Sequence, residues 1–161
     1  MKYFIKHYDT RYFAGIECPN GVNMKDNDPK KIPDLWSEFF GSYLDRVNEK
    51  IEPDHYIGLE TYPFDFMETG VFDYNAMVET KELIEPLSGM ITKKLKAGKY
   101  ICFPIPFDDI VTEIQRAYKF IKAENIKVHM GFDYEDYLTN ENYNEPGAIL
   151  NFCLLLEDDS K

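Results

Sequence analysis

The order of predicted elements repeats within this chain, and this repeat limits its folds more than any other feature. Residues 1–80 and residues 89–157 each read as two strands, one helix and two further strands. In the first half we expect a hairpin from 2–8 and 11–18, a helix over 32–47, and strands over 55–62 and 71–79. In the second half we expect a hairpin from 90–95 and 99–105, a helix from 107 to about 123, and strands over 127–134 and 148–156.

Two such β-β-α-β-β units predict an α+β fold. Together they would form one antiparallel sheet of about eight strands with two helices on one face, each unit covering what the other leaves exposed. A chain of 161 residues is long enough to bury this core as a single domain spanning 1–161. Helices related by an approximate two-fold leave a cleft between them, where small-molecule pockets commonly lie.

The helix predicted over 32–47 carries an unusually aromatic face. Its apolar positions recur at i, i+4, i+7 and i+11, and two further residues widen the stripe. These residues are Trp36, Phe40, Tyr43 and Val47, with Leu35 and Phe39. Pro33 and Asp34 suit the first turn, whereas Gly41 weakens the helix in its middle. The stripe has two interpretations, plain core packing or the wall of a pocket.

Composition excludes some classes of protein. The formal charge of −11 argues against binding a nucleic-acid backbone, and no block of Lys or Arg forms a stripe. The three cysteines are far apart and have no metal-ligand spacing, so we expect reduced thiols and no metal or other cofactor. The N-terminus has no apolar leader and no run could cross a membrane, so we expect a cytoplasmic protein that does not contact membranes.

Several short strings, taken in order, resemble a known family. They are Ile32-Pro33-x-Leu35-Trp36-x-x-Phe39, Tyr56-Ile57-Gly58-Leu59, Phe72-x-Tyr74, and Ala97-Gly98-Lys99-Tyr100 before Pro106-Phe107. Over roughly residues 3–156 the chain resembles the gyrase-inhibitor-like (GyrI-like) small-molecule-binding domain, also met as the effector-binding domain of AraC-type and multidrug-responsive regulators. The resemblance implies the duplicated GyrI/SOUL-like fold inferred above.

The resemblance also implies an aromatic pocket between the two helices, often with an acidic residue that pairs with lipophilic cations. The candidate ligand-binding residues are Trp36, Phe39, Phe40, Tyr56, Glu60, Tyr62, Phe103, Tyr137 and Asn151. Many family members carry a buried glutamate on the last strand. Here Asn151 occupies that stretch, which weakens the expectation of cation selectivity and of the hydrolytic activity that some relatives show.

The acidic residues have a simpler interpretation beside the functional one. Glu60 is equally consistent with a balancing carboxylate and with a solvated strand end, whereas Asp73 and Asp133 are expected in solvent. Glu135 and Asp136 are assigned to a polar loop over 135–146, which could serve acid–base chemistry only by folding over the cleft. His7, His55 and His129 are isolated and expected half in solvent, so no catalytic residue is assigned.

The leading hypothesis is an effector-binding or drug-sequestering module that binds a small, flat or cationic organic molecule. No DNA-binding segment is recognisable, so we expect no direct nucleic-acid contact and no transcriptional role for this chain alone. A first alternative is a hydrolase of the same fold, in which Glu60 or Tyr62 assists water. A second is an acidic interaction protein that inhibits a protein partner, a DNA-handling enzyme.

Overall fold

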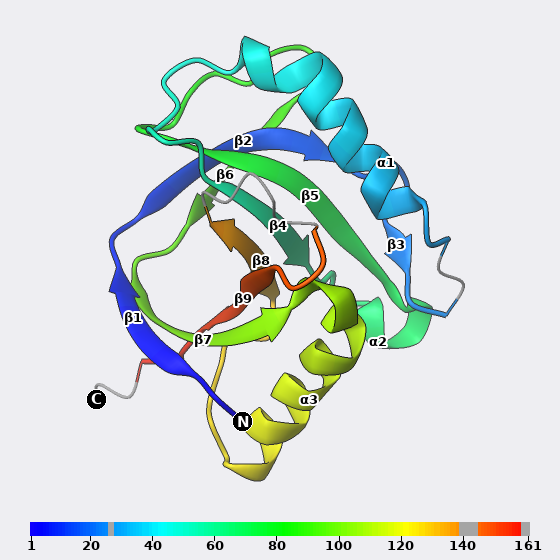
Figure 1. Ribbon diagram of the computed structural model, residues 1–161, viewed down its shortest axis with the longest axis vertical. Helices are drawn as coiled ribbons and strands as arrows, with labels where there is room; N and C mark the ends of the chain where they lie inside the picture. Colours follow the sequence, from blue (N-terminus) through cyan, green and yellow to red (C-terminus); the bar gives the residue numbers. More distant parts are fainter. Residues whose placement is uncertain (26–27, 139–144, 159–161) are drawn as a thin grey trace.

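One antiparallel sheet joins the strands of both halves in a computed structural model of the protein (Figure 1). The structure describes residues 1–25, 28–138 and 145–158. The strands are β1 (Phe4–Tyr8), β2 (Arg11–Glu17), β3 (Val22–Asn23), β4 (Tyr56–Thr61), β5 (Val71–Thr80), β6 (Ile91–Leu95), β7 (Gly98–Pro106), β8 (Phe132–Leu138) and β9 (Ile149–Leu155). Their order is β1-β7-β9-β8-β4-β5-β2-β6, with β3 paired to β5. The sheet of about eight strands and the duplicated α+β layout are therefore confirmed.

The predicted hairpins are wrong, because the edge strands are exchanged between the halves. β1 pairs with β7, placing Tyr8 opposite Gly98, and β2 pairs with β6, placing Arg11 opposite Leu95. The sheet curls enough to bring its distant strands together, since the Arg11 guanidinium carbon lies 3.7 Å from the Tyr8 ring centroid. A short connection at residues 9–10 can therefore lead from one end of the sheet to the other. Sequence pattern finds the strands, but this curvature decides their partners.

The two main helices cover one face of the sheet (Figure 1). α1 (Lys31–Glu38) continues through a π-helical turn (Phe39–Tyr43) and a 3-10 turn (Leu44–Arg46). α3 (Ile110–Ala123) follows a 3-10 turn (Phe107–Asp109), and the short α2 (Phe66–Thr69) lies between β4 and β5. Both predicted main helices are confirmed. The π-helical turn rotates the aromatic stripe, so that Trp36 and Phe39 are buried whereas Phe40 and Tyr43 are only half-buried.

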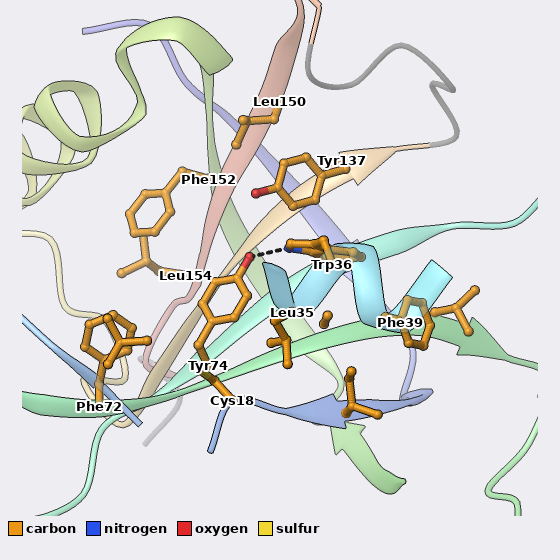
Figure 2. Close-up of a cluster of buried hydrophobic side chains, with 14 of the residues drawn as sticks. Cys18, Leu35, Trp36, Phe39, Phe72, Tyr74, Tyr137, Leu150, Phe152 and Leu154 are labelled. Carbon is orange, nitrogen blue, oxygen red and sulfur yellow. Dashed lines mark hydrogen bonds between the residues drawn. The ribbon is translucent and has the colours of Figure 1, made fainter. Parts of the chain in front are cut away.

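Each face of the sheet has its own hydrophobic core. The larger lies beneath the helices and includes Trp36, Phe39, Tyr74 and Phe152 (Figure 2). The smaller lies on the opposite face, inside the curl of the sheet, and includes Phe13, Tyr100 and Tyr134. The cysteines are buried free thiols, two of which, Cys102 and Cys153, face each other on β7 and β9 in the smaller core. The prediction that these thiols are reduced agrees with this arrangement.

The penultimate strand lies further along the chain than predicted. A strand was expected over 127–134 and a polar loop over 135–146, but β8 runs from Phe132 to Leu138. The sequence of β8 alternates strictly, with residues 132, 134 and 136 on one face and 133, 135 and 137 on the other. Its acidic residues were mistaken for loop residues because burial of carboxylates is uncommon. Residues 139–144 of the expected loop lie outside the described residues.

Within the part of the chain that the structure describes, every helix is too short or too polar to span a lipid bilayer.

Candidate functional site

Three carboxyl groups lie together at the centre of the sheet, on the face that the helices cover. β4 and β8 are neighbours, and their register places Glu60 opposite Asp133 and Gly58 opposite Glu135. The exposed fractions are 7% for Glu60, 0% for Asp133 and 6% for Glu135. Glu60 interacts electrostatically with both other carboxyl groups. We call Glu60, Asp133 and Glu135 the carboxyl cluster.

Four tyrosine hydroxyl groups surround this cluster. Tyr62 lies 2.8 Å from Glu60 Oε2 and 2.8 Å from Asp133 Oδ2, and the Tyr118 hydroxyl of α3 also donates to Asp133 Oδ2. The hydroxyls of Tyr137 and Tyr74 approach Glu135 Oε1 at 2.7 Å and 3.2 Å. Asp133 Oδ1 is buried without a hydroxyl or N–H donor. The cluster is thus well supplied with neutral donors and keeps one acceptor to spare.

The carboxyl cluster has no protein cation beside it. In the described ranges 1–25, 28–138 and 145–158, no ion pair joins any of these three residues to Lys, Arg or His. Burial raises the pKa of Glu60 well above its usual value, and the neighbouring Asp133 and Glu135 raise it further. Burial also raises the pKa of Asp133 to about 6, although hydrogen bonds from Glu60, Tyr118 and Tyr62 oppose this. Burial raises the pKa of Glu135 in the same direction. All three shifts have the same direction, so the cluster keeps its protons to higher pH than exposed carboxyl groups do.

Gly58 of β4 has no side chain, and this leaves room for the Tyr74 hydroxyl group next to the sheet. A Cβ atom at this position would lie 2.2 Å from the Tyr74 hydroxyl oxygen and 3.0 Å from Glu135 Oε1. Both distances are shorter than ordinary contacts, so any side chain at position 58 would displace Tyr74.

Trp36 of α1 closes the site from above. Its indole N–H donates to the Tyr74 hydroxyl at 2.9 Å (Figure 2), and this hydroxyl in turn donates to Glu135. The indole ring stacks on Phe40 at 5.5 Å and meets Tyr137 edge-on at 5.5 Å. The hollow lined by Trp36, Phe40, Tyr56 and Tyr137 leaves no space for a water molecule. The predicted aromatic wall exists, and in this structure its own rings fill the space between the halves.

The structure brings most of the predicted ligand-binding residues together and separates two of them. Trp36, Phe39, Phe40, Tyr56 and Tyr137 form the aromatic layer, while Glu60 and Tyr62 belong to the carboxyl cluster and its phenols.

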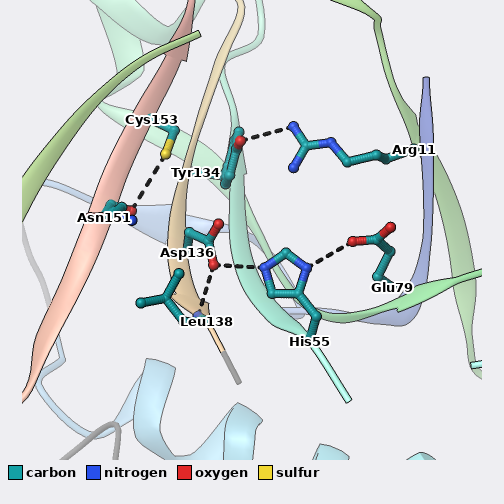
Figure 3. A network of polar contacts seen from close by, with 8 residues as sticks. All are labelled: Arg11, His55, Glu79, Tyr134, Asp136, Leu138, Asn151 and Cys153. Carbon is teal, nitrogen blue, oxygen red and sulfur yellow. Dashed lines mark hydrogen bonds and ion pairs between the residues drawn. The ribbon is translucent and has the colours of Figure 1, made fainter. Parts of the chain in front are cut away.

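Phe103 and Asn151 lie elsewhere. Phe103 packs against Phe120 of α3 and against Tyr3, with ring centroids 6.0 Å and 6.1 Å away. Asn151 alternates with Leu150 and Phe152 of the larger core, so its side chain lies on the opposite face of the sheet from Trp36 (Figure 3).

Sequence reasoning missed four residues of the site. Asp133 was expected in solvent and Glu135 in a loop, and both expectations are wrong because both side chains are buried on β8. Tyr74 and Tyr118 were not named as site residues, although Tyr74 belongs to the string Phe72-x-Tyr74. The alternation of Asp133, Glu135 and Tyr137 at i, i+2 and i+4 is a strand pattern that could have indicated the cluster.

A second polar network lies on the face opposite the helices. His55 bridges two strands, with its Nδ1 2.8 Å from Glu79 of β5 and its Nε2 2.7 Å from Asp136 of β8 (Figure 3). Burial alone would lower the pKa of His55, but the hydrogen bonds to Asp136 and Glu79 raise it to about 9. His55 was expected half in solvent, and its side chain is only 13% exposed. A charged imidazole held between two carboxylates acts as a structural clamp.

A cavity of about 610 Å³ lies away from the carboxyl cluster. Only the first half lines it, from the connection after β2 and from the outer side of α1, including Cys18, Asn20, Lys31 and Glu38. It contains neither a buried carboxylate nor a ring of the aromatic layer. The buried carboxyl groups and the aromatic layer therefore lie at the closed site between the halves and not at this cavity.

The fold and this site define a protein built from two pseudo-symmetric halves around an acidic, aromatic centre. A family model described as integron-associated effector binding protein matches residues 5–151, and the chain belongs to this family. A search of curated proteins found no match.

Solved structures show the same fold at low sequence identity. An integron cassette protein from the mobile metagenome of Vibrio cholerae is 21% identical, with a TM-score of 0.67 over 96% of this chain and 95% of that one. A putative bacterial transcription regulation protein from Staphylococcus aureus MU50 is 14% identical, with a TM-score of 0.70 over 98% and 99%. SAV2435, whose structure was solved bound to tetraphenylphosphonium, is 13% identical in sequence. Its TM-score is 0.73 over 98% of this chain and 94% of that one. These likenesses confirm the GyrI-like architecture.

Proposed function

We propose that the protein binds a small, flat or lipophilic organic cation at the carboxyl cluster, beneath the aromatic layer of α1. The observation that carries this proposal is a set of three buried carboxyl groups without any protein cation among the described residues. Burying acids in this way costs stability unless a positive charge compensates them. A cationic guest would supply that charge.

The aromatic layer suits the same kind of guest. Tyr137 donates to Glu135 and Trp36 is connected to it through Tyr74, while Tyr56 and Tyr137 both meet the Trp36 ring edge-on. A delocalised cation over such a ring gains roughly 0.5 to 2 kcal/mol, depending on how fully it is desolvated. The solved neighbour SAV2435 was determined with tetraphenylphosphonium, a cation of this class, which supports the choice of probe.

Binding requires the closed site to open. Because the rings of Trp36, Phe40, Tyr56 and Tyr137 leave no room even for water, a guest must displace at least one of them. Trp36 is the ring to move, since it belongs to α1 directly before the π-helical turn. Loss of its hydrogen bond to Tyr74 would then be offset by contact with the guest.

A charge-inverted pair of probes tests this function directly. Trp36 is the only tryptophan, so its fluorescence reports on the site alone. We expect tetraphenylphosphonium to change this fluorescence saturably and to raise the melting temperature, and tetraphenylborate, of similar size and opposite charge, to do neither. Equal responses to both ions, or none to either, would refute the proposal.

Hydrolysis of an activated small molecule is a second candidate, favoured by one observation. A carboxyl group that keeps its proton lies beside carboxylates that accept hydroxyl donors, an arrangement that suits acid–base chemistry. Turnover of reactive electrophiles that disappears in Glu60→Gln would support this activity. Turnover that persists in the variant would exclude Glu60 as its acid.

A further inference from the structure

We infer that, at the site proposed above, a monovalent organic cation enters in exchange for the proton that Glu60 holds, so that binding releases this proton to solvent. The inference rests on the proposed function and specifies how the site balances its charge.

Hydrogen-bond geometry assigns the proton to Glu60. Asp133 Oδ2 and Glu135 Oε1 each have two hydroxyl groups within reach, which favours the ionised form of both. Glu60 has only Tyr62, whose single hydroxyl proton cannot serve Glu60 and Asp133 at once. Glu60 also lies beside both other carboxyl groups, whose negative charges favour its neutral, protonated form.

The surroundings supply no competing charge. On its own strand Glu60 meets Tyr62, and β8 contributes Asp133, Glu135 and Tyr137. Tyr74 faces the cluster from β5 and Tyr118 from α3, while α1 and β9 contribute only the Trp36 indole and the Phe152 ring. Burial raises the pKa of each of these tyrosines, so all four phenols stay neutral. Of the groups named here, Glu60 is therefore the one that can release a proton when a positive charge enters.

The exchange balances without any covalent or redox step. The protonated protein and the cation give the complex and one free proton, and the net charge of the site is unchanged. Exchange is favoured because a positive charge held beside Glu60 stabilises its carboxylate relative to its neutral form, which lowers the pKa of Glu60 when the cation binds. Direct addition of a cation would instead leave Glu60 protonated next to the guest, and the site would gain less from it.

Calorimetry on the full chain with tetraphenylphosphonium tests the exchange. Titrations at one pH in two buffers of different ionisation enthalpy count the protons released, and we expect about one per cation. The affinity should also rise about tenfold per pH unit wherever Glu60 is protonated in the free protein. Both measurements use the unmodified protein, so they do not depend on the folding of a variant.

A matched pair of variants assigns the proton. Glu60→Gln should abolish proton release and flatten the pH dependence of binding. Glu17→Gln makes the same substitution at an exposed position on β2 and should leave both unchanged. Proton release that persists in Glu60→Gln, or a pH slope that Glu17→Gln also flattens, would overturn the assignment to Glu60.

The two hypotheses fail in different ways. Binding of tetraphenylphosphonium without proton release would overturn the exchange and leave the proposed function intact. Absence of binding at every pH would overturn both.

Discussion

A position without a side chain controls the site at the residue scale. Gly58 lies on β4 directly opposite Glu135, and the Tyr74 hydroxyl occupies the space where a Cβ atom would be. The chain of hydrogen bonds from Trp36 through Tyr74 to Glu135 passes through that hydroxyl. The absence of a side chain at position 58 therefore makes room for the hydrogen bonds that connect the aromatic layer to the carboxyl cluster.

Gly58→Ala should break this connection. The added Cβ would force Tyr74 aside, leaving the Trp36 N–H and Glu135 short of partners inside the core. We expect a loss of about 1 to 3 kcal/mol in the free energy of unfolding by urea denaturation, and a shifted Trp36 emission spectrum. Gly131→Ala is the control, since a Cβ atom there meets nothing within 4 Å and its stability should stay unchanged. Equal stability of the two variants would contradict this account of Gly58.

His55 provides a second prediction at the same scale. Its folded pKa of about 9 lies above the unfolded value of 6.5, so its contribution is complete below about pH 6.5 and is lost as pH rises through 9. The shift corresponds to at most about 3 kcal/mol. In His55→Gln, urea denaturation should show a large loss of stability at pH 6 that shrinks by pH 10. A loss that is independent of pH would mean that the imidazole charge contributes nothing.

At the scale of elements, the first helix departs from ideal geometry where the site needs it. α1 gives way to a π-helical turn at Phe39–Tyr43, directly after Trp36 and with Gly41 at its middle. Such turns often mark functional positions, because a wide turn can revert to an α-helical one. Here that change would rotate the aromatic stripe relative to the sheet, and we connect it to the opening of the site.

Gly41→Ala tests the cost of this turn. A Cβ atom at Gly41 meets nothing within 4 Å, so the methyl group fits. We expect the free energy of unfolding to rise by up to about 1 kcal/mol, because glycine is a poor helix former. Gly15→Ala is the contrasting variant, since its Cβ would lie 1.9 Å from the Ala76 carbonyl oxygen and should prevent stable folding. A destabilised Gly41→Ala variant would show that the π-helical turn itself requires glycine.

At the scale of the whole molecule, both polar networks make stability fall as pH rises. An acid whose folded pKa is raised binds more protons in the folded state than in the unfolded one, so its ionisation destabilises the fold. For Asp133 this loss extends from about pH 4 to about 6, and for Glu60 it continues to higher pH. His55 acts in the same direction between about pH 6.5 and 9.

The pH profile of stability should therefore slope downward from about pH 5 to pH 9 in urea denaturation. Glu60→Gln should flatten the part of the slope due to the carboxyl cluster, so the variant gains stability relative to the unmodified protein as pH rises. Glu17→Gln should follow the original profile. Stability that increases from pH 5 to pH 8 would contradict the protonated cluster.

The sequence was informative wherever a local pattern sufficed. The period of the apolar residues located the helix over 107–123 and the strands over 55–62 and 71–79, and strand alternation correctly placed Tyr56, Gly58, Glu60 and Tyr62 on one face. It failed for Asp133 and Glu135, because solvated and buried carboxylates have the same local pattern. Only the approach of β4 to β8 separates the two cases.

The sequence by itself thus determined the elements, their duplication and the aromatic face of α1, since these follow from periodicity and turn chemistry along the chain. The tertiary structure decided the exchange of β1 and β6 between the halves, the gathering of three acids at the central strands, and the closure of the site by Trp36. The physical reason is that curvature, burial and charge neighbours arise only when distant segments meet, and no local pattern encodes them.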